Sequence, residues 1–198
     1  MFYPIWRRCL LAIPVVLSIL GSPAGVVARP ASVFVPHLEQ IQSNLPVGLA
    51  MRLPAELQLN NPLDIDKDQL VVRVFPSETP PSFTVSLFTC DRSPHSCLLG
   101  SFAVARQDFP SAQRDLQRHQ TLGDRITLAP NVEGYLIEGP LQNPSYSFST
   151  VMWEQNDMIY TISFPAIERQ NILFMALSMA WEQPLYRRVS RRASIDFG

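Results

Sequence analysis

The sequence predicts an α+β fold in which an antiparallel sheet of about six to eight strands packs against a C-terminal amphipathic helix. Short runs with alternating apolar and polar residues recur between turns that contain proline or glycine. Asn156-Asp157 separates two such runs, and these residue types tolerate the positive φ angles of a two-residue hairpin turn. After Pro165, apolar residues recur at helical spacing.

The chain has 198 residues, of which 46% are hydrophobic and 17% are charged. This length suits one domain with a buried core, and we expect residues 29–182 to form it. The formal net charge of −1 argues against a nucleic-acid partner, because nucleic-acid-binding domains are usually basic. Residues 183–198 are predicted to be a basic, mobile tail.

Residues 1–28 resemble a secretory signal peptide. Arg7 and Arg8 form a positive start, residues 9–20 are apolar, and small residues lead to a cleavage site between Ala28 and Arg29. An uncleaved anchor is the alternative, although 12 apolar residues fall short of the ~20 that cross a bilayer. We therefore expect an exported protein of the periplasm, a lumen or the extracellular space.

Export changes how the cysteines are interpreted. Cys9 would leave with the signal peptide, and the remaining pair, Cys90 and Cys97, is expected to form a disulfide. Cleavage would also remove two of the 16 basic residues and none of the 17 acidic ones, which leaves a net charge of about −3.

The first half of the exported chain is predicted to be mostly extended. Pro76 to Pro81 hold three prolines and cannot form a central strand. Ahead of them we expect an extended leader at 29–34, a short helix at 36–44, a strand at 48–54, a polar loop at 60–68 and a strand at 69–75.

The middle of the chain is predicted to hold two hairpins and a surface helix. Strands 82–90 and 97–106 would be closed at their loop by the disulfide, which should add about 2 kcal/mol of stability. The helix would span 111–120, with Ser111 as its N-cap and its end near Gly123. Short strands at 125–128 and 133–137, a turn at 129–131 and a loop at 139–145 follow.

The last hairpin and the helix after it are predicted to form the core. If Asn156-Asp157 is the turn, Trp153 faces Tyr160 and Val151 faces Ile162. Met152 and Ile159 interrupt the otherwise polar opposite face, which also holds Glu154. The predicted core residues are Val151, Trp153, Tyr160, Ile162, Phe164, Met175 and Met179.

Three stretches carry a resemblance to a known group: Cys90 and Cys97 with Leu98 to Gly100, Arg125 to Ala129 with Gly134-Tyr135, and Trp153 to Ile162 with Met175 to Met179. They resemble an uncharacterised group of small exported bacterial domains of the cyanobacterial type. The chain is also similar to a domain of unknown function that lies outside the membrane in some anti-sigma factors and sporulation lipoproteins. The resemblance covers roughly residues 45–180 and implies export without catalytic residues. The order of elements resembles, more weakly, the PsbP-like fold.

The sequence contains no recognisable catalytic or metal-binding pattern. Asp64 to Asp68 resemble the opening of a calcium loop, but Gln69 and Phe75 stand where glycine and glutamate are needed. His37, His95 and His119 lack a second ligand at a metal-like spacing. We therefore predict no cofactor and no metal.

These observations favour an exported, non-enzymatic domain that binds a protein or another envelope component. The alternatives are an accessory or assembly factor of a membrane complex, as in PsbP-like proteins, and an enzyme with an unrecognised site. Arg187, Arg188, Arg191 and Arg192 could bring the tail to an anionic membrane or an acidic partner. The loop between Cys90 and Cys97 is a candidate working surface.

Overall fold

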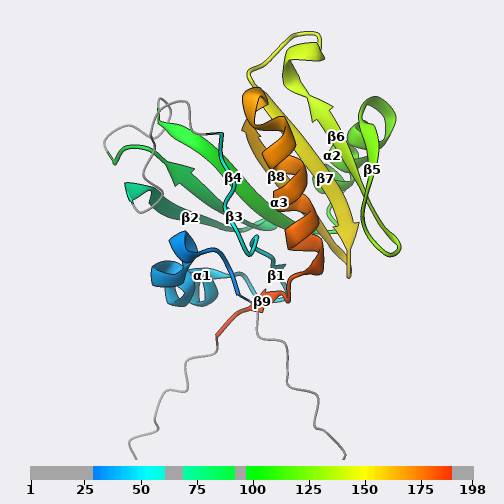
Figure 1. Ribbon diagram of the computed structural model, residues 1–198. Helices are drawn as coiled ribbons and strands as arrows, with labels where there is room; N and C mark the ends of the chain where they lie inside the picture. The colour runs from blue at the N-terminus through cyan, green and yellow to red at the C-terminus, as the bar shows by residue number, and fades with distance from the viewer. Residues whose placement is uncertain (1–28, 61–68, 92–96, 189–198) are drawn as a thin grey trace, which may run out of the picture.

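A computed structural model describes residues 29–60, 69–91 and 97–188 (Figure 1). A seven-stranded antiparallel sheet has the order β2-β3-β4-β8-β7-β6-β5, and a separate two-stranded sheet pairs β1 with β9. The predicted α+β class is therefore confirmed. The strands are β1 (Ala50–Met51), β2 (Val71–Glu78), β3 (Pro81–Phe88), β4 (Leu98–Arg106), β5 (Asp124–Ala129), β6 (Val132–Glu138), β7 (Phe148–Gln155), β8 (Met158–Pro165) and β9 (Leu185–Tyr186).

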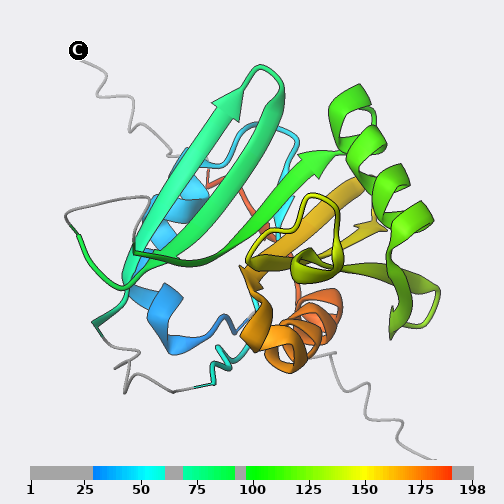
Figure 2. The same ribbon diagram turned by 90° about the horizontal axis from the view of Figure 1, so that it is seen from above.

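Helices lie on both faces of the large sheet. The C-terminal helix α3 crosses one face and α2 lies on the other (Figures 1 and 2). The N-terminal helical segments η1 and α1 share the core with α3. The helical elements are η1 (Ser32–His37), α1 (Leu38–Asn44), α2 (Pro110–Leu122), η3 (Gly139–Leu141), η4 (Ala166–Glu168) and α3 (Arg169–Trp181).

The β7–β8 hairpin has the predicted register. Asn156 and Asp157 adopt φ angles of 54° and 62°, which suit the tight turns that match the twist of two antiparallel strands. Trp153 pairs with Tyr160, and their rings stack with centroids 5.3 Å apart. Val151 pairs with Ile162 two residues further along the strands, on the same face of the sheet.

The main core lies between this face of the sheet, α3 and the N-terminal helical segments. The seven predicted core residues are each no more than 1% exposed. Phe102 joins the two sides, because its ring makes edge contacts with Phe34 and Phe164 at centroid distances of 5.6 and 5.4 Å. A Cβ atom at Gly100 would lie 2.3 Å from the Phe164 ring, so a larger residue there would displace the ring.

A smaller core lies on the opposite face of the sheet and explains why Met152 and Ile159 interrupt the polar pattern of that face. Met152 and Ile159 pack against Ala112 and Leu116 of α2.

Helix α2 begins one residue earlier than predicted. Pro110 occupies its first turn and Phe109 the N-cap, without a side-chain hydrogen bond, so the prediction of Ser111 as N-cap is wrong. Proline suits this place because the first amides of a helix have no partner within it.

Several predicted boundaries are also corrected. β2 continues through Pro76 to Glu78, which is possible because β2 is an edge strand of the sheet. The predicted leader 29–34 is helical from Ser32 onward. The predicted strand 48–54 is reduced to Ala50–Met51.

The C-terminal boundary at residue 182 is too early. Leu185 and Tyr186 pair with Met51 and Ala50 as the two-stranded sheet, and the Arg188 amide donates to the Gln42 carbonyl at 3.2 Å. The segment expected to be a free tail is thus attached to the domain at least through residue 188. The predicted signal peptide with Ala28, the loop residues 61–68, His95, and the tail residues Arg191 and Arg192 lie outside the described residues.

Candidate functional site

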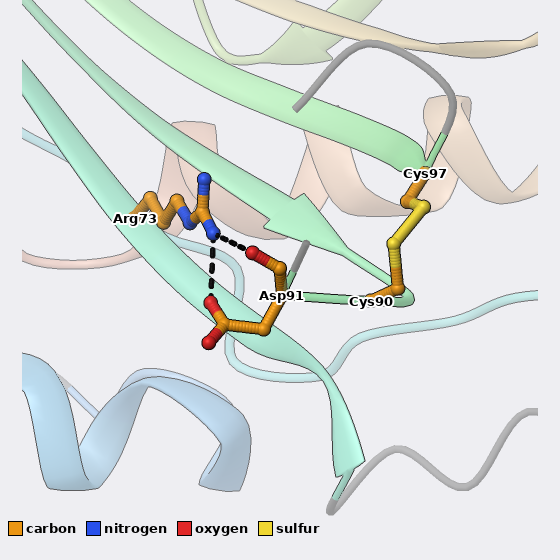
Figure 3. Close-up of polar contacts among 4 residues, drawn as sticks. All are labelled: Arg73, Cys90, Asp91 and Cys97. Carbon is orange, nitrogen blue, oxygen red and sulfur yellow. Dashed lines mark hydrogen bonds and ion pairs between the residues drawn. A yellow bond between two sulfur atoms is a disulfide. The ribbon is translucent and has the colours of Figure 1, made fainter. Parts of the chain in front are cut away.

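The disulfide between Cys90 and Cys97 closes the loop between β3 and β4 (Figure 3). Beside it, the Arg73 guanidinium donates to a carboxylate oxygen of Asp91 at 2.7 Å and to the Asp91 carbonyl at 2.6 Å. The same guanidinium lies 5.1 Å from the centroid of the Phe88 ring. These contacts hold the start of the loop against β2 and occupy the Arg73 guanidinium. This part of the loop therefore has a structural role.

Beyond Asp91, three carboxylates among the described residues form ion pairs with arginine side chains. Asp108 accepts two hydrogen bonds from Arg106, and this interaction lowers the pKa of the Asp108 carboxyl. Two further ion pairs, Arg125–Glu133 and Arg169–Glu138, hold two more of them. Glu154 is exposed on the hairpin. Within the described ranges, no group of three or more His, Cys, Asp or Glu residues could hold a metal ion.

His119 is the one buried histidine among the described residues, at 9% exposure. Its Nδ1 lies 2.8 Å from the Asp115 carbonyl, and its Nε2 has no hydrogen-bond partner. Burial lowers the pKa of the imidazole. Because it borders a helix–sheet contact and has no second titratable ligand, His119 is a structural residue.

Two buried charged side chains were not anticipated from the sequence. Arg52, 5% exposed, donates to the carbonyls of Met179, Ala180 and Glu182 at the end of α3. Glu168, 4% exposed, accepts hydrogen bonds from the Asn60 amide and the Asn171 side chain, each at 2.7 Å. Both residues join α3 to the segment that precedes β2, which defines their role as structural.

A cavity of about 200 Å³ lies between the N-terminal half of α2 and the sheet. Its walls are mainly apolar, with Phe109, Met152 and Ile159 among them, and Ser82 and Asp115 supply polar groups. Ser111 and Thr161 also line it, and Asp115, its single charged side chain, lies four residues after Ser111 on α2. A cavity of this size with mainly apolar walls could hold a small, largely apolar molecule.

The most distinctive surface is the outer side of α3. From Ile172 to Trp181 the helix has no charged residue, and Ser178 is its single polar side chain. The residues that turn away from the core are Phe174, Leu177 and Trp181, which are 47%, 39% and 64% exposed. We call these three residues the α3 outer face.

This arrangement departs from the usual surface helix. The predicted buried stripe is present, since Ile172, Met175, Ala176, Met179 and Ala180 face the core. An amphipathic helix then turns polar residues to water, whereas the last turns of α3 present apolar residues on that side as well. The sequence did contain one sign of this exposed apolar face, because residues 172–181 hold no charged residue. Helical spacing alone does not show which of these apolar residues face the core and which face water.

The α3 outer face is held in a defined orientation. The Trp181 indole nitrogen donates to the Leu128 carbonyl at 3.1 Å, which fixes the ring against the end of β5. Ser178 accepts a hydrogen bond from the Ala55 amide at 2.9 Å and ties the other side of the helix to the chain before β2. A rigid aromatic surface loses little conformational entropy when a partner covers it.

The predicted core residues thus lie in one buried cluster, and the predicted cysteine pair forms a disulfide. Among the described residues, no helix is long and apolar enough to cross a membrane. Comparison of the chain with protein-family models, with curated proteins and with solved structures finds no match.

Proposed function

We propose that this protein is an exported, non-enzymatic domain that binds a protein partner through the α3 outer face. The observation that carries the proposal is the exposure of Phe174, Leu177 and Trp181 on a helix segment without charge. Contiguous exposed apolar residues on a folded domain mark interaction sites more often than isolated ones do. Aromatic residues also contribute a large share of binding energy in protein interfaces.

Export is supported by the charged, apolar and small-residue order of residues 1–28. The Cys90–Cys97 bond is compatible with an oxidising compartment. A non-enzymatic role is supported by the engagement of Asp108, Glu133 and Glu138 with arginine side chains. It is also supported by the largely apolar lining of the cavity under α2.

Site-specific photocrosslinking in the cells that make the protein tests this function. A photoreactive residue at Leu177 should yield one defined crosslinked protein, whereas the same residue at Gln117, exposed on α2, should yield none. Addition of Phe174→Glu should abolish the crosslink, because a carboxylate cannot enter an apolar interface without a large desolvation cost. A crosslink between two copies would identify the partner as a second molecule of this chain.

The variants must leave the fold intact for this test to be decisive. Leu177 and Phe174 are exposed, so Leu177→Glu and Phe174→Glu should change the free energy of unfolding by less than about 0.5 kcal/mol. Leu141→Glu, at a residue that is 77% exposed on η3, is the matched control and should keep the crosslink. Equal crosslinking from Leu177 and Gln117, or a crosslink that survives Phe174→Glu, would refute the proposed surface.

A further inference from the structure

Both ends of the described chain lie at the same end of the molecule. The Arg29 amide lies 3.5 Å from a carboxylate oxygen of Glu182, and the Arg188 amide donates to Gln42. Figure 1 shows both ends of the coloured chain at the lower end of the molecule, and Figure 2 shows that they leave it on different sides. Whatever precedes residue 29 and follows residue 188 is therefore joined to the domain at this end.

A groove of about 360 Å³ opens at the same end. It is formed by the turn before β1, the start of β8 and the segment around β9. Val47 and Tyr186 are the most exposed of its apolar lining residues, at 73% and 62%, and no carboxylate lines the groove. Its apolar wall consists mainly of Val47, Leu49, Met158, Tyr160, Pro184 and Tyr186.

Positive charge lies beside this apolar groove. Arg187 lines its rim and Arg188 follows, both exposed, and neither forms a salt bridge with a described residue. The sequence then adds Arg191 and Arg192, with Asp196 as the one acid between 189 and 198. A second groove, on the other side of Gly48 and Met158, is lined by Arg106 together with the carboxylates Asp108 and Asp157. Positive charge is therefore in excess only in the groove beside β9.

We infer that this end of the protein docks on the surface of an anionic phospholipid membrane. Arg187 and Arg188 would contact headgroup phosphates, with which guanidinium groups form strong charge-assisted hydrogen bonds. Val47 and Tyr186 would enter the interfacial region, where an aromatic ring with a polar tip is favoured, and the groove between them would receive the apolar part of a lipid.

The position of the chain ends supports a membrane in preference to another ligand. The apolar run 9–20 is separated from Arg29 by eight residues, which span at most about 29 Å when fully extended. While residues 1–28 remain attached, a membrane-inserted run would hold this end near the bilayer. After cleavage, the arginine cluster and the exposed apolar pair would remain to bind the surface.

Vesicle co-sedimentation of the exported form, purified after expression of the full-length gene, tests the inference. Binding should be strong to vesicles of phosphatidylcholine with roughly a third phosphatidylglycerol, weak to phosphatidylcholine alone, and reduced by salt. The double variant Arg187→Gln, Arg188→Gln should weaken binding about 25-fold, since each basic residue near the surface contributes roughly a fivefold gain. Arg114→Gln, Arg118→Gln on α2 makes the same charge change elsewhere and should alter binding less than twofold.

The apolar contribution is tested separately. Val47→Ser with Tyr186→Ser should weaken vesicle binding at least fivefold, while Leu141→Ser on η3 should leave it unchanged. Phe174→Glu, Leu177→Glu should also leave vesicle binding unchanged, so this inference and the proposed partner surface can fail independently. Equal binding to neutral and anionic vesicles, no binding to either, or an equal loss with the α2 variant would overturn the inference.

Discussion

The guanidinium carbon of Arg52 lies 5.8 Å from the centroid of the Tyr160 ring. The same guanidinium donates to three carbonyls at the end of α3, and the Tyr160 hydroxyl donates to the Ala50 carbonyl at 2.8 Å. These two side chains therefore connect α3, β8 and β1 in one buried polar cluster. Tyr160 also lines the groove at the end of the molecule where β1 pairs with β9.

Arg52→Met should lower the free energy of unfolding by about 3 kcal/mol, measured by urea denaturation. The variant fills a similar volume but removes the side-chain donor of the Met179 and Glu182 carbonyls, whereas the Ala180 carbonyl keeps its hydrogen bond from the Gln155 side chain. Each unsatisfied buried acceptor costs roughly 1–3 kcal/mol before water relieves it. It also removes a cation from the negative end of the helix dipole. Arg52→Lys should recover part of the loss, because one ammonium cannot replace the guanidinium fork. A change below about 0.5 kcal/mol for Arg52→Met would show that water satisfies these carbonyls.

Tyr160→Phe and Trp153→Ala separate the polar and apolar parts of the hairpin core. Tyr160→Phe keeps the ring stack on Trp153 and removes only the hydrogen bond to Ala50, so we expect a loss of about 1 kcal/mol. Trp153→Ala removes a fully buried indole and should cost roughly 3–5 kcal/mol. Thermal or urea unfolding measures both. Similar losses for the two variants would contradict the assignment of Trp153 as the larger part of the core.

The sequence was a good guide wherever local rules determine the structure. The Asn156-Asp157 turn and strand alternation together predict that Trp153 faces Tyr160, because both rules act over a few residues. Helical spacing after Pro165 likewise predicts the buried stripe of α3. The buried residues at these elements therefore followed from the sequence.

The features that the sequence did not predict depend on contacts between distant segments. Arg52 bonds to residues about 130 positions later, and no local pattern distinguishes it from a surface arginine. The β1–β9 pair joins two strands of two residues each, too short to leave a periodic signal. The α3 outer face is apolar like the core stripe, so only the positions of the sheet and of Trp181 show which residues remain exposed.

Reduction of the Cys90–Cys97 bond should destabilise the domain modestly. A bond between residues seven apart in sequence restricts a small loop of the unfolded chain, so the loss should be about 2 kcal/mol. The Cys90→Ser, Cys97→Ser variant should show this loss in urea denaturation, with the wild type under oxidising conditions as reference. Non-reducing mass spectrometry of the exported protein should show no free thiol at these positions and an N-terminus at Arg29. Two free thiols would contradict the disulfide, and an intact residue 1–28 segment would contradict cleavage.

His119 should make the stability of the domain depend on pH below neutrality. Burial holds its pKa below the ordinary value of 6.5, so the unfolded chain takes up a proton at a higher pH than the folded one. The free energy of unfolding should be fully retained above about pH 6.5 and should decrease as the pH falls from there toward the folded-state pKa. Urea denaturation between pH 7.5 and pH 4.5 should show this decrease.

His119→Phe is the matched variant for this measurement, because it keeps a ring at this buried position of α2 and removes the titrating nitrogen. The variant should give a flatter profile between about pH 6.5 and pH 5 than the wild type. Asp108, whose pKa is also lowered, titrates only at more acidic pH, and its contribution should be the same in both proteins. Identical profiles for wild type and variant would contradict the assignment of this pH dependence to the buried His119 imidazole.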